Sequence, residues 1–335
     1  MRTVRRSIQA LAVALLLASV TVSLSTCGGI GGSELAGGGT GGTGISTGAV
    51  SGYGSVVVND VHYNTNAKTK KFSHGKDNSA AIDQDLFRVG MVVTIRYTPG
   101  DNNAVEIDYA PNLVGTIAAK DSVPDLAIRV LGHTVVLDNA GLFDNLAQSG
   151  VVEVSGFVDA SGRIRATYVE PMHPAPLPGE TFEIKGFISD PRPSDGTFEI
   201  GPLPDGSGST VTVSYTPGAI RDLPAEPAHG MYVQVVTRDT QPGSGGIRAN
   251  TVAPFVPRSV FPEGATVDLE GLVTTPWSGF GNDLSFAVEG KRVRWEAGTE
   301  FGGGTRDDLR QTNLKVQVHG MENRGDLSAA RIVFR

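Results

Sequence analysis

The chain of 335 residues contains a single cysteine, Cys27, so it cannot form an internal disulfide bond. Its stability must therefore come from apolar cores, even in an oxidising compartment. Aromatic residues make up only 7% of the chain, and no H-E-x-x-H zinc motif occurs. The chain also lacks an apolar run of the about 20 residues that a membrane-spanning helix needs, which argues against an ordinary helical anchor.

Positive charge is also scarce. Lys and Arg number 28 against 35 Asp and Glu, which gives a formal net charge of −7. Residues 1–26 hold three arginines and no acid, so losing them moves the charge from −7 to −10. An acidic surface repels phosphates, so we expect no nucleic-acid partner. The one basic cluster, Lys68-Thr-Lys-Lys71, is interpreted as a solvated loop.

Residues 1–26 have the pattern of a secretory signal: three arginines, then an apolar stretch at residues 10–22. The string Leu24-Ser-Thr-Cys27-Gly28 follows and resembles the lipobox of bacterial lipoproteins. That resemblance implies cleavage before Cys27, lipidation of its thiol and attachment to the membrane. Gly28 implies sorting to the outer membrane. Plain secretion is the alternative, because Thr26 stands where lipoproteins usually carry Gly, Ala or Ser.

A glycine-rich segment comes next, with ten glycines in residues 28–44. Such a stretch loses too much backbone entropy to fold by itself, so residues 27–47 are predicted to form the lipidated cysteine and a flexible tether. Residues 39–44 match G-x-G-x-x-G, but a dinucleotide site needs a preceding strand and a following helix. We therefore assign this string to the tether.

After residue 47 the chain repeats a pattern about every 60–80 residues. Each repeat opens with a short strand around a glycine, adds a strand pair, reaches a leucine before a turn, and closes with an alanine-centred strand. The leucines are Leu86, Leu146, Leu223 and Leu309, and the alanines are Ala104, Ala166, Ala249 and Ala330. We predict repeats over residues 48–110, 111–174, 175–258 and 259–335, the third bearing a Gly/Ser insertion.

The alternation of apolar and polar residues predicts about five short, half-buried strands per repeat. Five antiparallel strands leave open edges unless the sheet closes. We therefore expect an all-β chain of about four tandem, five-stranded, OB-like antiparallel barrels, after a signal peptide and a tether.

A family resemblance is clearest in the first two repeats. It rests on Gly52-Tyr-Gly54-Ser-Val-Val-Val-Asn59-Asp-Val-His-Tyr63, on the step from Leu86 to Gly90-Met-Val-Val, and on Ala104-Val-Glu-Ile. These strings resemble a bacterial domain-of-unknown-function family of tandem small β-barrel repeats in envelope lipoproteins, mostly proteobacterial. The resemblance covers most of residues 45–335. It implies an outer-membrane lipoprotein facing the periplasm or the cell surface, and it transfers no catalytic residue.

Motifs that carry chemistry are few. The G-x-S-x-G string at residues 44–48 closes the tether, and the S-x-x-K string at 73–76 lacks its S-D-N and K-T-G partners, so both are interpreted as accidental. No histidine pair has metal-ligand spacing, so we predict solvent-facing or satisfied histidines, no metal and no other cofactor. A metal between repeats, or Ca²⁺ at the Asp101 and Asp205 loops, is the alternative. The histidines are His62, His74, His133, His173, His229 and His319.

The better candidate site is a surface. Trp277 and Phe280 lie in a Gly/Ser loop, where ligand stacking is one interpretation and packing over a barrel end or against the third repeat is the other. We predict no catalytic residue, and expect a non-enzymatic binding or structural module for a protein or glycan partner. The alternative is an enzyme that acts on an envelope polymer. Its carboxylate pairs would be Glu153/Asp159 or Glu296/Glu300, which we expect to be solvated.

Overall fold

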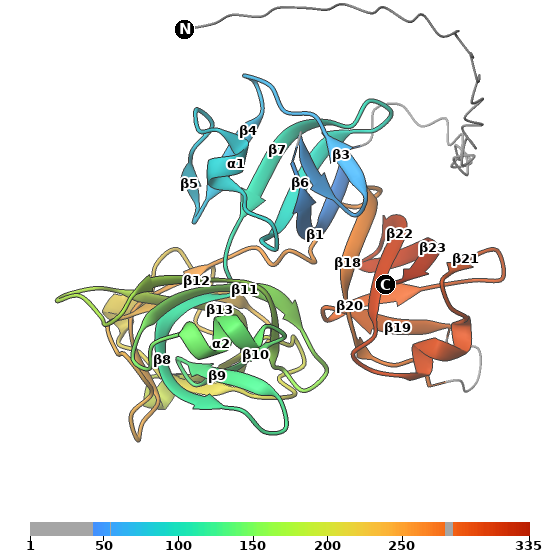
Figure 1. Ribbon diagram of the computed structural model, residues 1–335. Helices are drawn as coiled ribbons and strands as arrows, with labels where there is room; N and C mark the ends of the chain where they lie inside the picture. The colour runs from blue at the N-terminus through green and yellow to red at the C-terminus, as the bar shows by residue number, and fades with distance from the viewer. Residues whose placement is uncertain (1–42, 54, 279–283) are drawn as a thin grey trace, which may run out of the picture. The chain divides into compact units, whose positions relative to one another are not determined.

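The computed structural model describes residues 43–53, 55–278 and 284–335 (Figure 1). Cys27 and Phe280 lie outside these residues, so the predictions made for them stay predictions. Strands dominate the described part, as predicted, and its helices are single short turns. None of the helices in that part is long and apolar enough to cross a membrane.

Four groups of strands, here called units 1 to 4, follow one another along the chain. Unit 2 shows their common plan: its five strands close in the order β8-β9-β10-β12-β11-β8, with α2 (Ala140–Asn145) before β11. Only the β10–β12 pair is parallel. This closed barrel confirms the five-stranded, OB-like prediction. Its strands are β8 (Leu113–Asp121), β9 (Leu126–Val130), β10 (His133–Leu137), β11 (Val151–Val158) and β12 (Ile164–His173).

Units 3 and 4 close in the same order, with 3-10 turns in the place of α2. Unit 3 contains β13 (Phe182–Arg192), β14 (Thr197–Gly201), β15 (Val211–Ser214), β16 (Tyr232–Thr237) and β17 (Ile247–Pro254), with η1 (Pro193–Asp195) and η2 (Pro217–Ala219). Unit 4 contains β18 (Thr266–Thr275), β19 (Ser285–Val288), β20 (Lys291–Arg294), β21 (Glu300–Gly302), β22 (Lys315–Asn323) and β23 (Asp326–Phe334), with η3 (Arg306–Arg310).

Unit 1 varies the plan. A bridge from Asn64 to Asn103 links its third strand to its last, and an added hairpin of β4 and β5 pairs with β7. Its first strand begins at Gly44, inside the segment assigned to the tether. The strands are β1 (Gly44–Gly52), β2 (Val56–Val58), β3 (Val61–Tyr63), β4 (Lys70–Ser73), β5 (Lys76–Asp77), β6 (Val92–Thr98) and β7 (Asn103–Tyr109), with α1 (Asp83–Leu86).

The recurring alanines have a structural reason. In every unit the hairpin of the last two barrel strands contains a bulge, which sharpens the local bend and twist. In each case the bulge lies on the last strand, and the paired residue just before its extra residue is alanine; in unit 4 this is Ala329, and the predicted Ala330 is the extra residue itself. The pairs are Tyr97↔Ala104, Gly156↔Ala166, Thr237↔Ala249 and Gly320↔Ala329.

The first strand of each barrel fastens the units in pairs. In its N-terminal half this strand has a barrel partner on one edge only, because the second strand begins to pair further along. The open edge is covered by another barrel: β1 pairs with β18 in parallel, and β8 pairs with β13 antiparallel. Pairing removes edges that would otherwise invite aggregation.

The apolar cores follow the same pairing. One continuous cluster of buried side chains runs through units 2 and 3 and includes Leu113, Ile184 and Val252. Units 1 and 4 keep separate clusters, but Ile45 of β1 is buried in the cluster of unit 4. The four barrels are therefore joined by core contacts as well as by main-chain hydrogen bonds.

Candidate functional site

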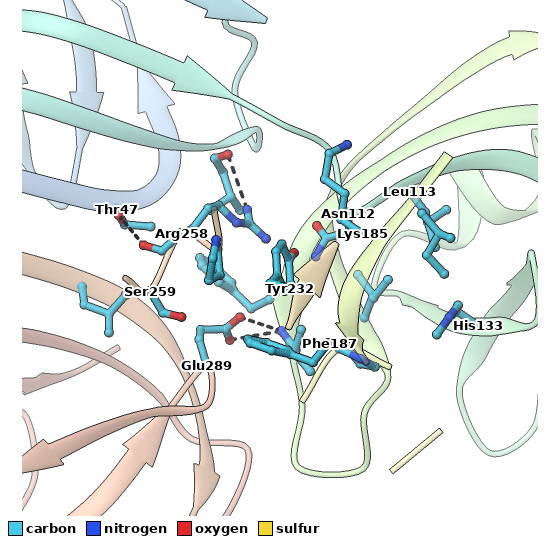
Figure 2. A pocket seen from close by; sticks show the side chains of 18 of the residues that line it. Thr47, Asn112, Leu113, His133, Lys185, Phe187, Tyr232, Arg258, Ser259 and Glu289 are labelled. Atoms are coloured by element: carbon cyan, nitrogen blue, oxygen red, sulfur yellow. Dashed lines mark hydrogen bonds between the residues drawn. The ribbon is translucent and has the colours of Figure 1, made fainter. Parts of the chain in front are cut away.

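A small cavity of about 50 Å³ lies where the four units meet. Thr47 of unit 1, Asn112 of unit 2, Tyr232 of unit 3 and Glu289 of unit 4 all line it (Figure 2). The linker between β17 and β18 adds Arg258. A space of this size holds a few water molecules, whereas pockets for drug-sized ligands measure roughly 300–1,000 Å³.

Arg258 connects the linker to two other units. Its guanidinium donates to the carbonyl oxygens of Val92 at 3.5 Å and of Gly156 at 3.2 Å. Its own carbonyl accepts from the Thr47 hydroxyl at 3.5 Å (Figure 2). One linker residue thus binds β1, β6 and β11 at the same place.

Glu289 fastens unit 4 to unit 2. It occupies the β19–β20 turn with Gly290, where both residues have positive φ, as a type I′ hairpin turn requires. Its carboxylate accepts the Val158 N–H at 3.0 Å and the Leu272 N–H at 3.1 Å. Burial raises the pKa of Glu289 to about 7, although the two N–H groups and Arg258 oppose that rise.

Gly290 itself touches unit 3. A Cβ at this position would lie 2.5 Å from Cδ of Pro204, so the close approach needs glycine in addition to the positive φ. The same hairpin turn therefore contacts unit 2 through Glu289 and unit 3 through Gly290.

His74 forms a second fastening, between units 1, 2 and 3. It lies in the β4–β5 turn with a φ of 52°, and its ring nitrogens are 3.0 Å from Glu153 and 3.6 Å from Glu183. The Tyr109 hydroxyl donates to Glu153 at 2.5 Å, and Lys185 lies 2.7 Å from Glu183.

These contacts shift the pKa values of His74 and Glu183. The bond to Glu153, helped by Glu183, raises the pKa of His74 to about 9. Burial alone would raise the pKa of Glu183, but His74 and Lys185 hold it at about 2. The cluster is therefore a set of ion pairs that crosses three units, and the S-x-x-K string containing His74 is a hairpin turn.

Two expectations about polar residues were wrong. Glu153 and Asp159 are 7% and 0% exposed, where solvated positions were expected. Asp159 accepts backbone N–H groups from Ser161 and Arg163 and pairs with Arg163 and Arg165. The two carboxylates are thus engaged by different partners.

The other error concerns His133, which is neither solvent-facing nor satisfied. It is 2% exposed, neither ring nitrogen has a hydrogen-bond partner in the described chain, and burial lowers its pKa to about 4. Among the described residues, no group of three or more His, Cys, Asp or Glu is arranged to hold a metal ion. The Asp101 and Asp205 carboxylates accept N–H groups from their own turns.

Trp277 lies within unit 4. It is 9% exposed, packs edge-to-face on Trp295 at 5.2 Å, and carries the Arg310 guanidinium 4.8 Å from its ring centre. Most of the ring is therefore covered by protein, and ligand stacking on Trp277 stays a prediction that requires this ring to be uncovered. Glu296 and Glu300 are exposed on the same unit.

The insertion of the third repeat has a role that the sequence did not suggest. Its loop packs against the β11–β12 turn of unit 2, where the Ser209 N–H donates to the Ser161 carbonyl at 3.2 Å. A Cβ on Gly208 would lie 2.6 Å from that carbonyl oxygen, and one on Gly162 would lie 2.8 Å from the Ser209 nitrogen. Glycine in both loops allows the two backbones to touch.

Comparisons with known proteins give a family but no activity. No match was found among curated proteins. A solved chain titled "drosophila Unr CSD456" is 14% identical and covers 65% of this chain and 94% of its own length. Its TM-score of 0.19 is too low to support a statement about fold or function.

A family model matches residues 45–108, 114–170 and 270–333, which correspond to units 1, 2 and 4 and make up more than half of the chain. Unit 3, with its insertion, is not among the matched segments. The chain belongs to the family described as domain of unknown function (DUF5666).

Proposed function

We propose that the protein is a non-enzymatic binding or structural module of the cell envelope, anchored through a lipid on Cys27. Its four barrels would act together as one platform for a protein or glycan partner. The proposal rests on the charged side chains that lie where units meet. Each of them forms a contact from one unit to another: His74, Glu153, Glu183 and Glu289.

A catalytic carboxylate must be free to exchange protons with a substrate. Glu153 instead accepts from Tyr109 and pairs with His74, and Asp159 is tied to two arginines. These contacts favour a mechanical role for the buried acids, and they support a proposal in which a partner would bind the outer surface of the barrels.

The lipid anchor is supported by the sequence around Cys27, and the envelope location by the same motif. Labelling of cells with a palmitate analogue tests both. We expect label on the wild-type chain and none on Cys27→Ser. An unlabelled wild-type protein would remove the anchor from the proposal.

Cross-linking in intact cells tests the binding role. We expect wild type to recover a defined protein or glycan after membrane solubilisation, and Cys27→Ser to lose it because the chain leaves the membrane. Recovery of lipid alone, together with breakdown of an envelope polymer by the purified chain, would favour an enzyme instead.

A further inference from the structure

Two titratable groups, on hairpin turns of different units, hold the barrels together. His74 extends from the β4–β5 turn of unit 1 to Glu153 on β11 and Glu183 on β13. Glu289 extends from the β19–β20 turn of unit 4 to the Val158 N–H at the end of β11. Both turns therefore converge on unit 2, and each contact is lost if its unit moves away.

We propose that these two turns form a proton-operated clasp, in which protonated His74 and protonated Glu289 fasten the units and loss of either proton loosens its junction. The clasp would be tightest at mildly acidic pH and would relax as the pH rises. This inference does not depend on the proposed binding role.

The surroundings of His74 favour its charged form. Glu153 and Glu183 face it from units 2 and 3, and the Tyr109 ring lies 5.8 Å away edge-on. Lys185 lies beyond Glu183 and pairs with it. Undocking would return the pKa of His74 from about 9 to its ordinary value of 6.5. Between these two pH values, docking is therefore coupled to the uptake of a proton by His74.

The surroundings of Glu289 favour its neutral form through burial. Arg258 opposes this from the linker, whereas Asp159 at the end of β11 reinforces it, and Tyr232 of β16 lines the same cavity. In the undocked state the pKa of Glu289 would return from about 7 to 4.5, so the carboxyl group would hold its proton less tightly. Docking therefore takes up a second proton between pH 4.5 and 7.

The pH dependence of docking has the same direction for His74 and Glu289. Each binds its proton more tightly when docked, so docking strengthens as the pH falls through 9 toward 6.5 for His74, and through 7 toward 4.5 for Glu289. Below about pH 4.5 the trend reverses, because Glu183 has a lowered pKa when docked and loses its ion pairs on protonation.

Residue-resolved hydrogen exchange on the full chain can follow each junction. The Val92 N–H donates to the Ser155 hydroxyl across units 1 and 2, and the Val158 N–H donates to Glu289 across units 2 and 4. We expect protection at Val92 to fall about ten-fold between pH 6.5 and 9, and at Val158 about ten-fold between pH 4.5 and 7.5, after correction for intrinsic rates. Amides of β9, inside unit 2, serve as the control and stay protected.

Two variants test the His74 contact and the Glu289 contact separately. Glu289→Gln keeps a neutral acceptor, so protection at Val158 should stay high at all pH values. His74→Asn tolerates the positive φ but removes the charge, so protection at Val92 should stay low at all pH values. Unchanged circular dichroism and β9 protection would show that both variants fold.

Flat wild-type profiles at both amides would overturn the clasp, as would wild-type pH dependence in both variants. Either result would leave the binding role to be decided by its own cross-linking experiment.

Discussion

The two barrel pairs are joined by equivalent strands but by different means. Units 2 and 3 meet through a short antiparallel pairing, Leu113↔Ile184 and Val114↔Glu183, above one continuous apolar cluster. Units 1 and 4 meet through a longer parallel pairing from Gly44↔Thr266 to Thr47↔Leu269, between clusters that remain separate. The first junction depends on one shared apolar core, and the second on main-chain and polar contacts together with Ile45, which unit 1 buries in the cluster of unit 4.

The largest expected effect is on the shared core. Leu113→Ala should destabilise units 2 and 3 together by about 2–5 kcal/mol, because a fully buried leucine leaves a cavity. Both tryptophans, Trp277 and Trp295, lie in unit 4, so the loss should appear in far-ultraviolet circular dichroism and not in tryptophan fluorescence during denaturant unfolding. Leu177→Ala, at a leucine that is 54% exposed, is the matched control. A shift confined to fluorescence would contradict the shared core.

The next effect crosses from unit 1 to unit 4. Ile45 lies in β1 but is buried in the cluster of unit 4, so Ile45→Ala should lower the midpoint of the tryptophan transition by an equivalent of about 2–3 kcal/mol. The control is Val105→Ala on the exposed face of β7. If the tryptophan transition did not move, units 1 and 4 would be energetically independent.

A smaller effect is expected from the polar contacts at that junction. The Asn59 side-chain amide donates to the Ser46 hydroxyl, the Thr47 carbonyl and the Asp268 carbonyl at 3.0–3.4 Å. Asn59→Gly preserves the positive φ and should cost about 1–2 kcal/mol in the tryptophan transition. Asn59→Ala should cost more, because alanine is strained at this φ. Equal stability of both variants and wild type would show that these bonds are not needed.

The smallest effect is a pH dependence inside unit 4. The hydrogen bond to Asp268 raises the pKa of His319 above its usual 6.5. Its contribution is complete below pH 6.5 and is lost as the pH rises through the raised value. His319 is 40% exposed, so screening limits the contribution to under about 1 kcal/mol. His319→Gln should remove this part of the pH dependence of the tryptophan transition. A steeper pH dependence in the variant would refute the contribution of the His319–Asp268 hydrogen bond.

The repeats were predictable from local pattern. Val316 and Val318 are fully buried on β22 while Gln317 between them is not, as period-2 alternation requires. The leucine before each turn is a core residue where a helical turn follows β10 or β21: Leu146 is 3% exposed and Leu309 is 0% exposed. Both signals come from residues of the same repeat, so they can be recognised in the sequence without knowing how the repeats contact one another.

The junctions were not predictable in the same way. The burial of Glu153 depends on Tyr109 and on a hairpin of unit 1 about 80 residues earlier, and the partial burial of Glu289 depends on Val158. A glutamate in an alternating strand or a Glu-Gly turn looks solvated until the neighbouring barrel is known. The pairing of β1 with β18 joins strands more than 200 residues apart, and no local pattern specifies such a partner.

The position of β1 also has a mechanical consequence. Its first four residues are bonded to β6 on one edge and to β18 on the other. A pull along the strand axis, applied through the chain before Gly44, would load both rows of hydrogen bonds in shear, so that many must break together. Traction at this end would thus be shared between the first and last barrels, and resistance to it would be set by the unfolding barrier and not by the strength of any one bond.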